Sequence, residues 1–250
     1  MSNQKLLILL ILLSGFFFVE CKKESNSPPT DQEILGNSVK PAALDEYIYP
    51  IQPGTIGWDT IQIHGNLYGM VQIPDTVLQK ISTWGLVETC FKYPLRSDCF
   101  SWNMPSLWIN DASRNFNGLI ELYSRADVVE ILLYEYRYLD LKKYSYYDDC
   151  QYIELMVGCD AYLSKLNDRQ LIYLTGVALE KCKEQRELFD SFIYPQSIFI
   201  MGNAMVHAGY KPFIDYCNTH KLPVSTGFAY YRIGTDYTSI EKYARDFVSN

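Results

Sequence analysis

Residues 128–143 read VVEILLYEYRYLDLKK, and apolar side chains occupy almost every face of the helix that this stretch predicts. Leu132 and Tyr136 lie on one side of that helix, while Ile131 and Tyr138 lie on another. A helix at the surface of a globular protein carries a single apolar stripe. The pattern therefore predicts a helix that is buried on several sides, and it favours an array of helices over a simple bundle.

Helical patterns continue on both sides of this stretch and are joined in pairs by short loops. We expect an all-α (mainly α-helical) fold, arranged as a right-handed array of antiparallel helix pairs. The expected helices cover residues 74–82, 82–94, 112–124, 128–143, 148–166, 168–188, 197–209, 211–220 and 236–250.

This arrangement resembles HEAT and armadillo repeats, in which helix pairs recur about 35 to 45 residues apart. The stretches IPDTVLQKISTWGLVETCFKYPL (73–95) and FNGLIELYSRADVV (116–129) also resemble a group of uncharacterised secreted proteins of the Bacteroidetes. That second resemblance covers roughly residues 47–207 and implies no known activity.

The chain before the helices has a different composition. Residues 45–74 are rich in β-branched and aromatic side chains and are broken by Pro53-Gly54 and Gly65-Asn66. We expect a short extended segment with short strands, lying on the helices. Residues 45–250 are thus interpreted as one domain, with an extended part at 45–74 and helix pairs at 75–250.

The N-terminus has the pattern of an export signal. Lys5 is followed by the apolar stretch 6–19, which falls short of the ~20 residues that span a bilayer. No later stretch is long and apolar enough to do so. We expect residues 1–20 to be a signal peptide.

Cys21 follows the apolar stretch directly and begins the run CKKESNS (21–27). This pattern resembles the signals of Bacteroidetes-type lipoproteins, although Glu20 stands where those signals have a small residue. The resemblance implies lipidation at Cys21, export, and attachment to the outer membrane or cell surface. Residues 21–44, rich in Ser, Pro, Lys and Glu, then predict a flexible tether. An ordinary secretory signal is the alternative.

Six further cysteines occur downstream. If residues 150–165 and 169–186 form a hairpin centred near residue 166, then Cys150 and Cys182 are equally far from the turn, and we expect a possible disulfide between them. A Cys90–Cys99 pair is a second possibility, and buried free thiols are the third. No CxxC motif points to zinc.

Signatures of catalysis are missing from the sequence. No GxSxG, Walker A or GxGxxG motif occurs, and His64, His207 and His220 lack the spacing of a metal site. We therefore predict no catalytic, cofactor-binding or metal-binding residues. The carboxylates Glu130 and Glu135, like Asp140, are interpreted as a solvated helix face.

The formal net charge of −7 argues against nucleic-acid binding, which needs a basic surface. We expect a non-enzymatic lipoprotein of the cell envelope that binds a protein or peptide through its helices and contacts the membrane only through its anchor. The alternatives are a surface glycan-binding lipoprotein that uses tyrosines, among them those of residues 134–147, and tryptophans, or a carboxylate-based hydrolase with no sequence signature. A groove favours peptide, a flat aromatic row favours sugar, and two facing acids favour the enzyme.

Overall fold

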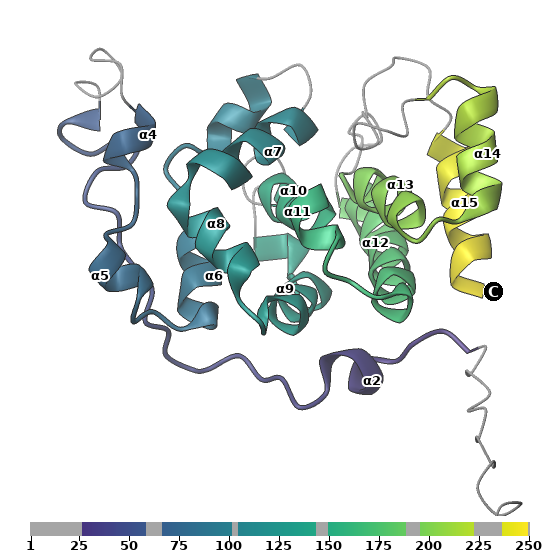
Figure 1. Cartoon of the computed structure of the whole chain (residues 1–250), viewed down its shortest axis with the longest axis horizontal. Helices are drawn as coiled ribbons and strands as arrows, with labels where there is room; N and C mark the ends of the chain where they lie inside the picture. Colours follow the sequence, from purple (N-terminus) through teal and green to yellow (C-terminus); the bar gives the residue numbers. More distant parts are fainter. Residues whose placement is uncertain are drawn as a thin grey trace, which may run out of the picture.

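The computed structural model describes residues 27–58, 67–101, 105–143, 150–188, 196–222 and 237–249. These residues form helices joined by irregular segments, and no strand occurs among them. The prediction of an all-α fold is therefore confirmed over the described chain (Figure 1).

Most of the helices are short. In chain order they are α2 (Asp31–Leu35), α4 (Leu67–Met70), α5 (Asp75–Leu78), α6 (Thr83–Phe91), η1 (Arg96–Ser101), α7 (Pro105–Asn115), α8 (Asn117–Ser124), α9 (Val128–Arg137), η2 (Leu141–Lys143), α10 (Gln151–Gly158), α11 (Asp160–Leu163), α12 (Asp168–Leu188), α13 (Ser197–His207), α14 (Lys211–Thr219) and α15 (Tyr237–Ser249).

Local sequence explains where two of the main helices begin. The Ser82 hydroxyl accepts a hydrogen bond from the Gly85 amide at 3.0 Å and so caps α6. Before α12, the Asn167 side chain accepts from the Gln170 amide at 3.0 Å, and the Gln170 side chain accepts from the Asn167 amide at 2.9 Å. This reciprocal pair satisfies two amides that would otherwise lack partners, and it fixes the start of the longest helix.

The single helix predicted over 112–124 is divided at Phe116, which is extended and stacks on Tyr93 with ring centroids 3.9 Å apart. The side chain of the next residue, Asn117, pairs with both backbone groups of Ile73. Its Nδ2 donates to the Ile73 carbonyl at 2.7 Å, and its Oδ1 accepts from the Ile73 backbone amide at 2.9 Å. Contacts with a distant segment therefore override the local helical pattern.

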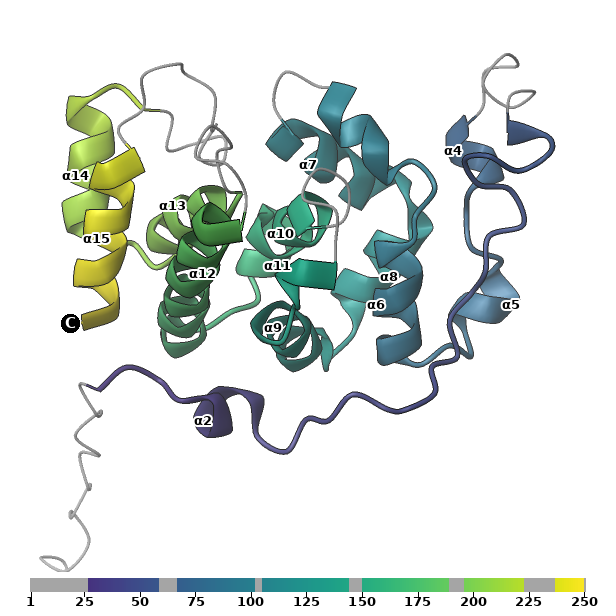
Figure 2. The ribbon, with the colours of Figure 1, turned by 180° about the vertical axis from the view of Figure 1, so that it is seen from behind.

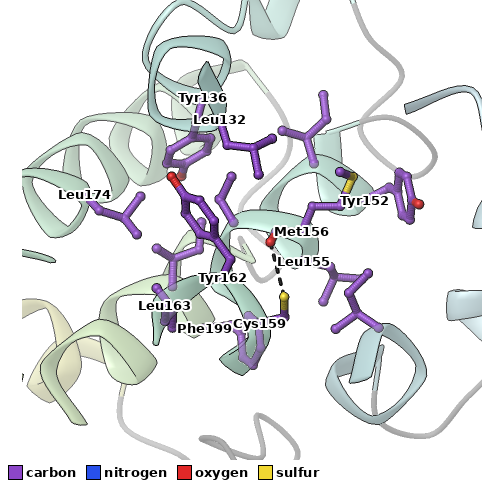
Figure 3. Packing of buried hydrophobic residues seen from close by; sticks show 14 of the residues in the cluster. Leu132, Tyr136, Tyr152, Leu155, Met156, Cys159, Tyr162, Leu163, Leu174 and Phe199 are labelled. Carbon is purple, nitrogen blue, oxygen red and sulfur yellow. Dashed lines mark hydrogen bonds between the residues drawn. The ribbon is translucent and has the colours of Figure 1, made fainter. Parts of the chain in front are cut away.

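The centre of the molecule is formed by α10 and α13. Every residue of α10 is buried, and so are the residues of α13 from Ser197 to Met205. The two helices approach closely at Gly158, where a Cβ atom would lie 2.7 Å from the Phe199 ring. The Asn203 side chain donates to the Gly158 carbonyl at 2.9 Å and completes this contact. Figure 3 shows the apolar side chains, Phe199 among them, that gather around α10.

The helix α9 is buried on several sides, as its sequence predicts. Leu132 and Tyr136 on one side are fully enclosed, and Ile131 on another is 4% exposed. Tyr134 is partly buried, and Tyr138, just after the helix, is 57% exposed. Burial goes further in α10, where every residue is buried.

The hairpin predicted for residues 150–165 and 169–186 does not form. The helix α10 ends at Gly158, and Cys159 is extended with ψ 154°, so that the chain turns into the short helix α11. The helix α12 packs mainly against α13 and α15. The register argument that placed Cys150 beside Cys182 therefore loses its basis.

The chain before the helices runs along one edge of the array. Residues 27–46, called the strap below, pass beneath α12, α9 and α6 in both views (Figures 1 and 2). Residues 27–44 of the predicted tether (21–44) lie on the helices and make side-chain contacts with them, and the flexibility of the tether stays a prediction. Residues 47–58 and 67–74 continue as an irregular segment with α4, and the short strands predicted for this part are absent from those residues.

Among the described helices, none has the length and apolar character needed to cross a membrane. The predicted signal peptide, residues 1–20, and the predicted lipidation site, Cys21, lie outside the described residues.

Candidate functional site

The strap is held first by Asp31, at the start of α2. One carboxylate oxygen of Asp31 lies 3.2 Å from Nε of Arg137 on α9, and the other accepts a hydrogen bond from the Tyr173 hydroxyl on α12 at 2.8 Å. Burial, and then the hydrogen bond to Asp31, raise the pKa of Tyr173 well above its ordinary value. Arg137 also pairs with Glu180 of α12. One strap carboxylate therefore bridges two helices of the body.

Glu33 provides the second contact of α2, because it lies 2.6 Å from Nη2 of Arg169. The hydrogen bond from Arg169 lowers the pKa of Glu33. Two residues further on, Leu35 is 4% exposed and packs into the core. Gly36 then ends the helix with φ 58°, a left-handed conformation that glycine adopts without a steric penalty. Thus α2 offers two carboxylates and one leucine to α9 and α12.

Lys40 makes the next contact of the strap. Its ammonium group lies 2.9 Å from Glu135 of α9 and 3.3 Å from Glu88 of α6. Burial raises the pKa of Glu135, and the nearby Lys40 partly opposes that shift. Lys40 therefore connects two carboxylates that would otherwise repel each other.

Asp45, near the end of the strap, contacts the start of α6, and Glu46 pairs with Lys92 just after the end of that helix. The Asp45 carboxylate accepts from the Ser82 amide at 2.7 Å and from the Ser82 hydroxyl, and these hydrogen bonds lower the pKa of Asp45. The approach is possible because residue 85 is glycine: a Cβ there would lie 2.2 Å from an Asp45 oxygen. Immediately after the strap, the Tyr47 amide donates to the Thr89 hydroxyl at 2.8 Å.

Cavities lie on both sides of α2. One of about 540 Å³ is lined by Glu33, Ile34, Glu130 and the first residues of α12, 167–170. A second, of about 200 Å³, lies between the strap residues Pro28, Pro29 and Asp31 and a surface that includes Arg137, Ile172, Tyr173, Val177 and Val248. The strap therefore does not fill the surface on which it lies.

A buried acid lies elsewhere, in the core between α9, α10 and α12. Glu154 is fully enclosed, and its Oε1 accepts from the Tyr136 hydroxyl at 3.1 Å and from the Gln185 side chain at 3.0 Å. The Ser197 hydroxyl donates to Gln185 at 2.7 Å. The other oxygen, Oε2, has no hydrogen-bond partner in the described part of the chain. Burial raises the pKa of Glu154 to about 7, against the hydrogen bonds from Gln185 and Tyr136.

Comparison with known proteins found no matching family model, no matching curated protein and no matching solved structure.

The carboxylates considered from the sequence do not face one another as an acid pair. Glu135 is bound to Lys40, and Asp140 lies 3.5 Å from Lys143. Glu130 lines the larger of the two cavities, together with Glu33 of the strap. The acid with the clearest perturbation, Glu154, is enclosed in the core, where a substrate from solvent does not reach it.

The histidines make ordinary surface contacts. His207 lies 3.0 Å from Asp160, which lowers the pKa of Asp160, and His220 contacts the Tyr216 carbonyl at 2.9 Å. His64 lies outside the described residues. Among the residues that the structure describes, no group of three metal-ligating side chains comes together.

The structure shows no disulfide between the described cysteines. Cys150 and Cys182, predicted as a possible disulfide, are both buried, and so are Cys90 and Cys99. Burial raises the pKa of Cys182 to about 12, so that the thiol is kept protonated. The Cys150–Cys182 pairing stays a prediction for peptide mapping, without the hairpin that motivated it.

Three aromatic rings meet beside the partly buried Tyr134 of α9. Trp84 and Tyr134 have ring centroids 5.2 Å apart with an interplanar angle of 87°, and Tyr134 and Tyr138 are 4.6 Å apart at 51°. The first pair packs edge against face and the second is tilted, so the three rings do not form one flat row. Tyr144, Tyr146 and Tyr147, the remaining tyrosines of the predicted platform, lie outside the described residues. The rings that are described thus lack the coplanar surface on which a sugar stacks.

The surface beneath the strap holds a polypeptide segment that includes the short helix α2. Arginine and tyrosine side chains of α9 and α12 bind its carboxylates, and its one leucine packs into the core. Sequence analysis missed Arg137, Arg169 and Tyr173, because their partners are over 100 residues away in the chain. One local signal was present: Thr30, followed three residues later by Glu33, is the pattern of a capped helix start, and Thr30 accepts from the Glu33 amide at 3.3 Å.

Proposed function

We propose that the protein is a non-enzymatic component of the cell envelope that binds a protein or peptide through the surface of its helices. The observation that carries this proposal is the strap itself. The body holds a segment of polypeptide through Asp31, Glu33 and Leu35, with partners on two helices. A surface that already binds one chain segment has the chemistry needed to bind another.

The sequence around Cys21 supports the location. In this proposal the protein is exported, loses residues 1–20, and is attached by lipid on Cys21 to the outer membrane or cell surface. The lipid anchor is then its sole contact with the membrane, and the acidic net charge of −7 speaks against nucleic acid as the partner.

For the architecture we propose the right-handed array of antiparallel helix pairs predicted from the sequence, as in HEAT and armadillo repeats. The order of contacts supports a stacked arrangement: α6 packs on α8 and α9, α9 on α10, α10 on α13, and α13 on α15. In such an array each layer contacts mainly its neighbours, and one edge is left for binding.

Two measurements test the proposal. The mass of the mature N-terminal peptide from native membranes is expected to show an acylated Cys21, and an unmodified cysteine would contradict the anchor. Purified full-length protein, immobilised through its C-terminus, is expected to retain an envelope protein in a saturable manner. Failure of any partner to exceed the level seen with a heat-unfolded sample would contradict peptide or protein binding.

A further inference from the structure

The strap is attached to the body much less firmly than the rest of the chain. Within residues 27–46, Leu35 is the single fully buried side chain, and most of the others are exposed. Ile34 is partly buried against the core. The remaining contacts are mainly ion pairs and hydrogen bonds at half-exposed positions, and such pairs contribute roughly 0–1 kcal/mol each. Just beyond the strap, Tyr49 is again fully buried and continuous with the core.

The body surface under α2 is complete without the strap. Arg137 keeps its pairing with Glu180 of α12, and Arg169 lies in the first turn of α12, which Asn167 and Gln170 fix independently of the strap. Tyr173 lies one turn further along the same helix. Removal of α2 therefore exposes a prearranged set of donors together with the site of Leu35.

The cavities show that this surface accommodates more than the strap. Spaces of about 540 Å³ and 200 Å³ flank α2 and are bounded by the same α12 residues that bind it. A segment with larger side chains beside the carboxylates would fill both spaces and so bury more apolar surface than the strap does.

We propose that the surface of α9 and α12 beneath α2 is a binding site for an acidic, leucine-containing segment of a partner protein, and that the strap is its intramolecular competitor. The matching segment carries two carboxylates two residues apart and a leucine two residues later, as in Asp31, Glu33 and Leu35. This inference rests on the proposed peptide-binding function and assigns it a site and a partner chemistry.

Competition by the strap has a quantitative consequence. A segment tethered by a short chain acts at an effective concentration of about the millimolar range, so that a free peptide with the same contacts is largely excluded. Weakening the strap is expected to expose the site, while weakening the body surface is expected to destroy it. The two kinds of variant therefore have opposite effects on a peptide added in solution.

The test uses a fluorescent synthetic peptide of residues 27–40, SPPTDQEILGNSVK, and the full mature chain with Cys21→Ser to prevent lipidation. In fluorescence anisotropy, the full chain with the substitutions D31N/E33Q in its strap is expected to bind this peptide at least tenfold more tightly than the chain with an unaltered strap. The variant D75N/D215N, with the same change of charge at exposed positions outside the strap, is the matched control and is expected to behave as the unaltered chain.

A charge exchange tests the specific contact. Adding R169E to the D31N/E33Q chain is expected to lower its affinity for the native peptide at least tenfold. A peptide carrying Glu33→Lys is expected to bind this triple variant again, because the two charges are exchanged. Circular dichroism of each variant confirms that the helices are intact. The inference would be overturned if the unaltered chain, the D31N/E33Q chain and its R169E derivative all bound the native peptide with equal affinity. It would also be overturned if the D31N/E33Q chain did not bind the peptide at millimolar concentration.

Three other outcomes distinguish the proposed site, its occupant and the proposed function. A concentration-dependent dimer abolished by R169E would assign the site to the strap of a second copy and overturn the choice of a partner protein. Retention of an envelope protein equally by the unaltered chain and by R169E would overturn the inference and leave the proposed function standing. Charge-dependent peptide binding without any envelope partner would support the site and contradict the function.

Discussion

The helix α10 and the strap are attached to the same molecule by opposite means. All of α10 is buried, it approaches α13 through Gly158, and its side chains pack among those of several helices. The strap runs along one edge of the array and is held by Asp31, Glu33 and Lys40, with Leu35 as its one deep apolar contact. Dense apolar packing fixes one unique conformation, whereas a few polar contacts on a loosely filled surface permit exchange. The difference separates the part that maintains the fold from the part suited to binding.

The largest effect is expected when a buried leucine is changed to alanine in α10 and, separately, in the strap. Leu155 is 1% exposed in α10 and Leu35 is 4% exposed in the strap, so their burial is nearly equal. Leu155→Ala is expected to lower the free energy of unfolding by about 3 kcal/mol, because the packed surroundings cannot close the cavity. Leu35→Ala is expected to lower the free energy of unfolding by less than about 1 kcal/mol. The strap can detach while the rest of the chain stays folded, so the loss is limited to the small free energy that holds the strap. Urea unfolding followed by circular dichroism measures both, and equal costs would contradict the comparison.

The second effect concerns the buried acid in the core. The pKa of Glu154 in the folded chain is about 7, above its ordinary value of 4.5. The stabilisation from this group is therefore complete below about pH 4.5 and is lost as pH rises through 7. The loss is on the order of 3 kcal/mol at pH 8, and Glu154→Gln is expected to remove that dependence while keeping the contacts to Tyr136 and Gln185.

The measurement for Glu154 is urea unfolding at pH 5 and at pH 8 for both chains. The variant is expected to be the more stable of the two at pH 8, with the difference reduced at pH 5. A variant that is destabilised equally at both values would show that the carboxyl group is not protonated in the folded core. Glu187→Gln, at an exposed position of α12, is the matched control.

A smaller effect is expected where the strap meets α6. Gly85→Ala places a Cβ where Asp45 Oδ1 now lies, and the two atoms would be 2.2 Å apart. The substitution is expected to displace Asp45 from Ser82 and to cost about 1 kcal/mol, the usual value of a capping interaction. In the background Asp45→Ala the same substitution is expected to cost less, because the side-chain contact is gone and only the contact with the backbone carbon of residue 45, at 3.0 Å, remains. Full additivity of the two changes in urea unfolding would show that the clash is relieved elsewhere.

The smallest effect on stability is expected from the ion pair between Arg169 and Glu33. Arg169→Gln is expected to change the free energy of unfolding by less than about 1 kcal/mol. It is nevertheless expected to speed proteolytic cleavage of the strap severalfold, because cleavage follows the local opening of that segment. Lys183→Gln, which alters an exposed ion pair of α12 away from the strap, is the control. Unchanged cleavage would place the attachment of the strap in other residues.

The sequence predicted the helices well where their patterns depend on local periodicity. The segments around α6, α9, α12 and α15 are helical in the structure as expected. The prediction missed residues 105–111 of α7, which no expected helix covered. Two further errors fall at Phe116 and Cys159, where an apparently continuous helix is interrupted. The first break accompanies contacts with Ile73 and Tyr93, and the second is the turn into α11. Such breaks depend on residues far away in the chain, which periodicity does not reveal.

The candidate site was predicted even less well. Polar and proline-rich composition between residues 27 and 44 is typical of a flexible linker, and that interpretation ignores where the partners lie. The carboxylates of Asp31 and Glu33 acquire a structural role solely because α9 and α12 place Arg137 and Arg169 beneath them. Only the capped start at Thr30 gave a local indication that this part of the chain is ordered.

The most direct test of the account is native-state hydrogen exchange of the full-length protein, comparing the amides of residues 33–36 in the strap with those of α10 and α13. The account predicts that the strap amides exchange through local opening, at least a hundredfold faster than the slowest core amides, and that added salt accelerates the strap alone. Equal protection of the strap and the core, unaffected by salt, would show that the strap is a permanent part of the fold and would contradict its role as a displaceable segment.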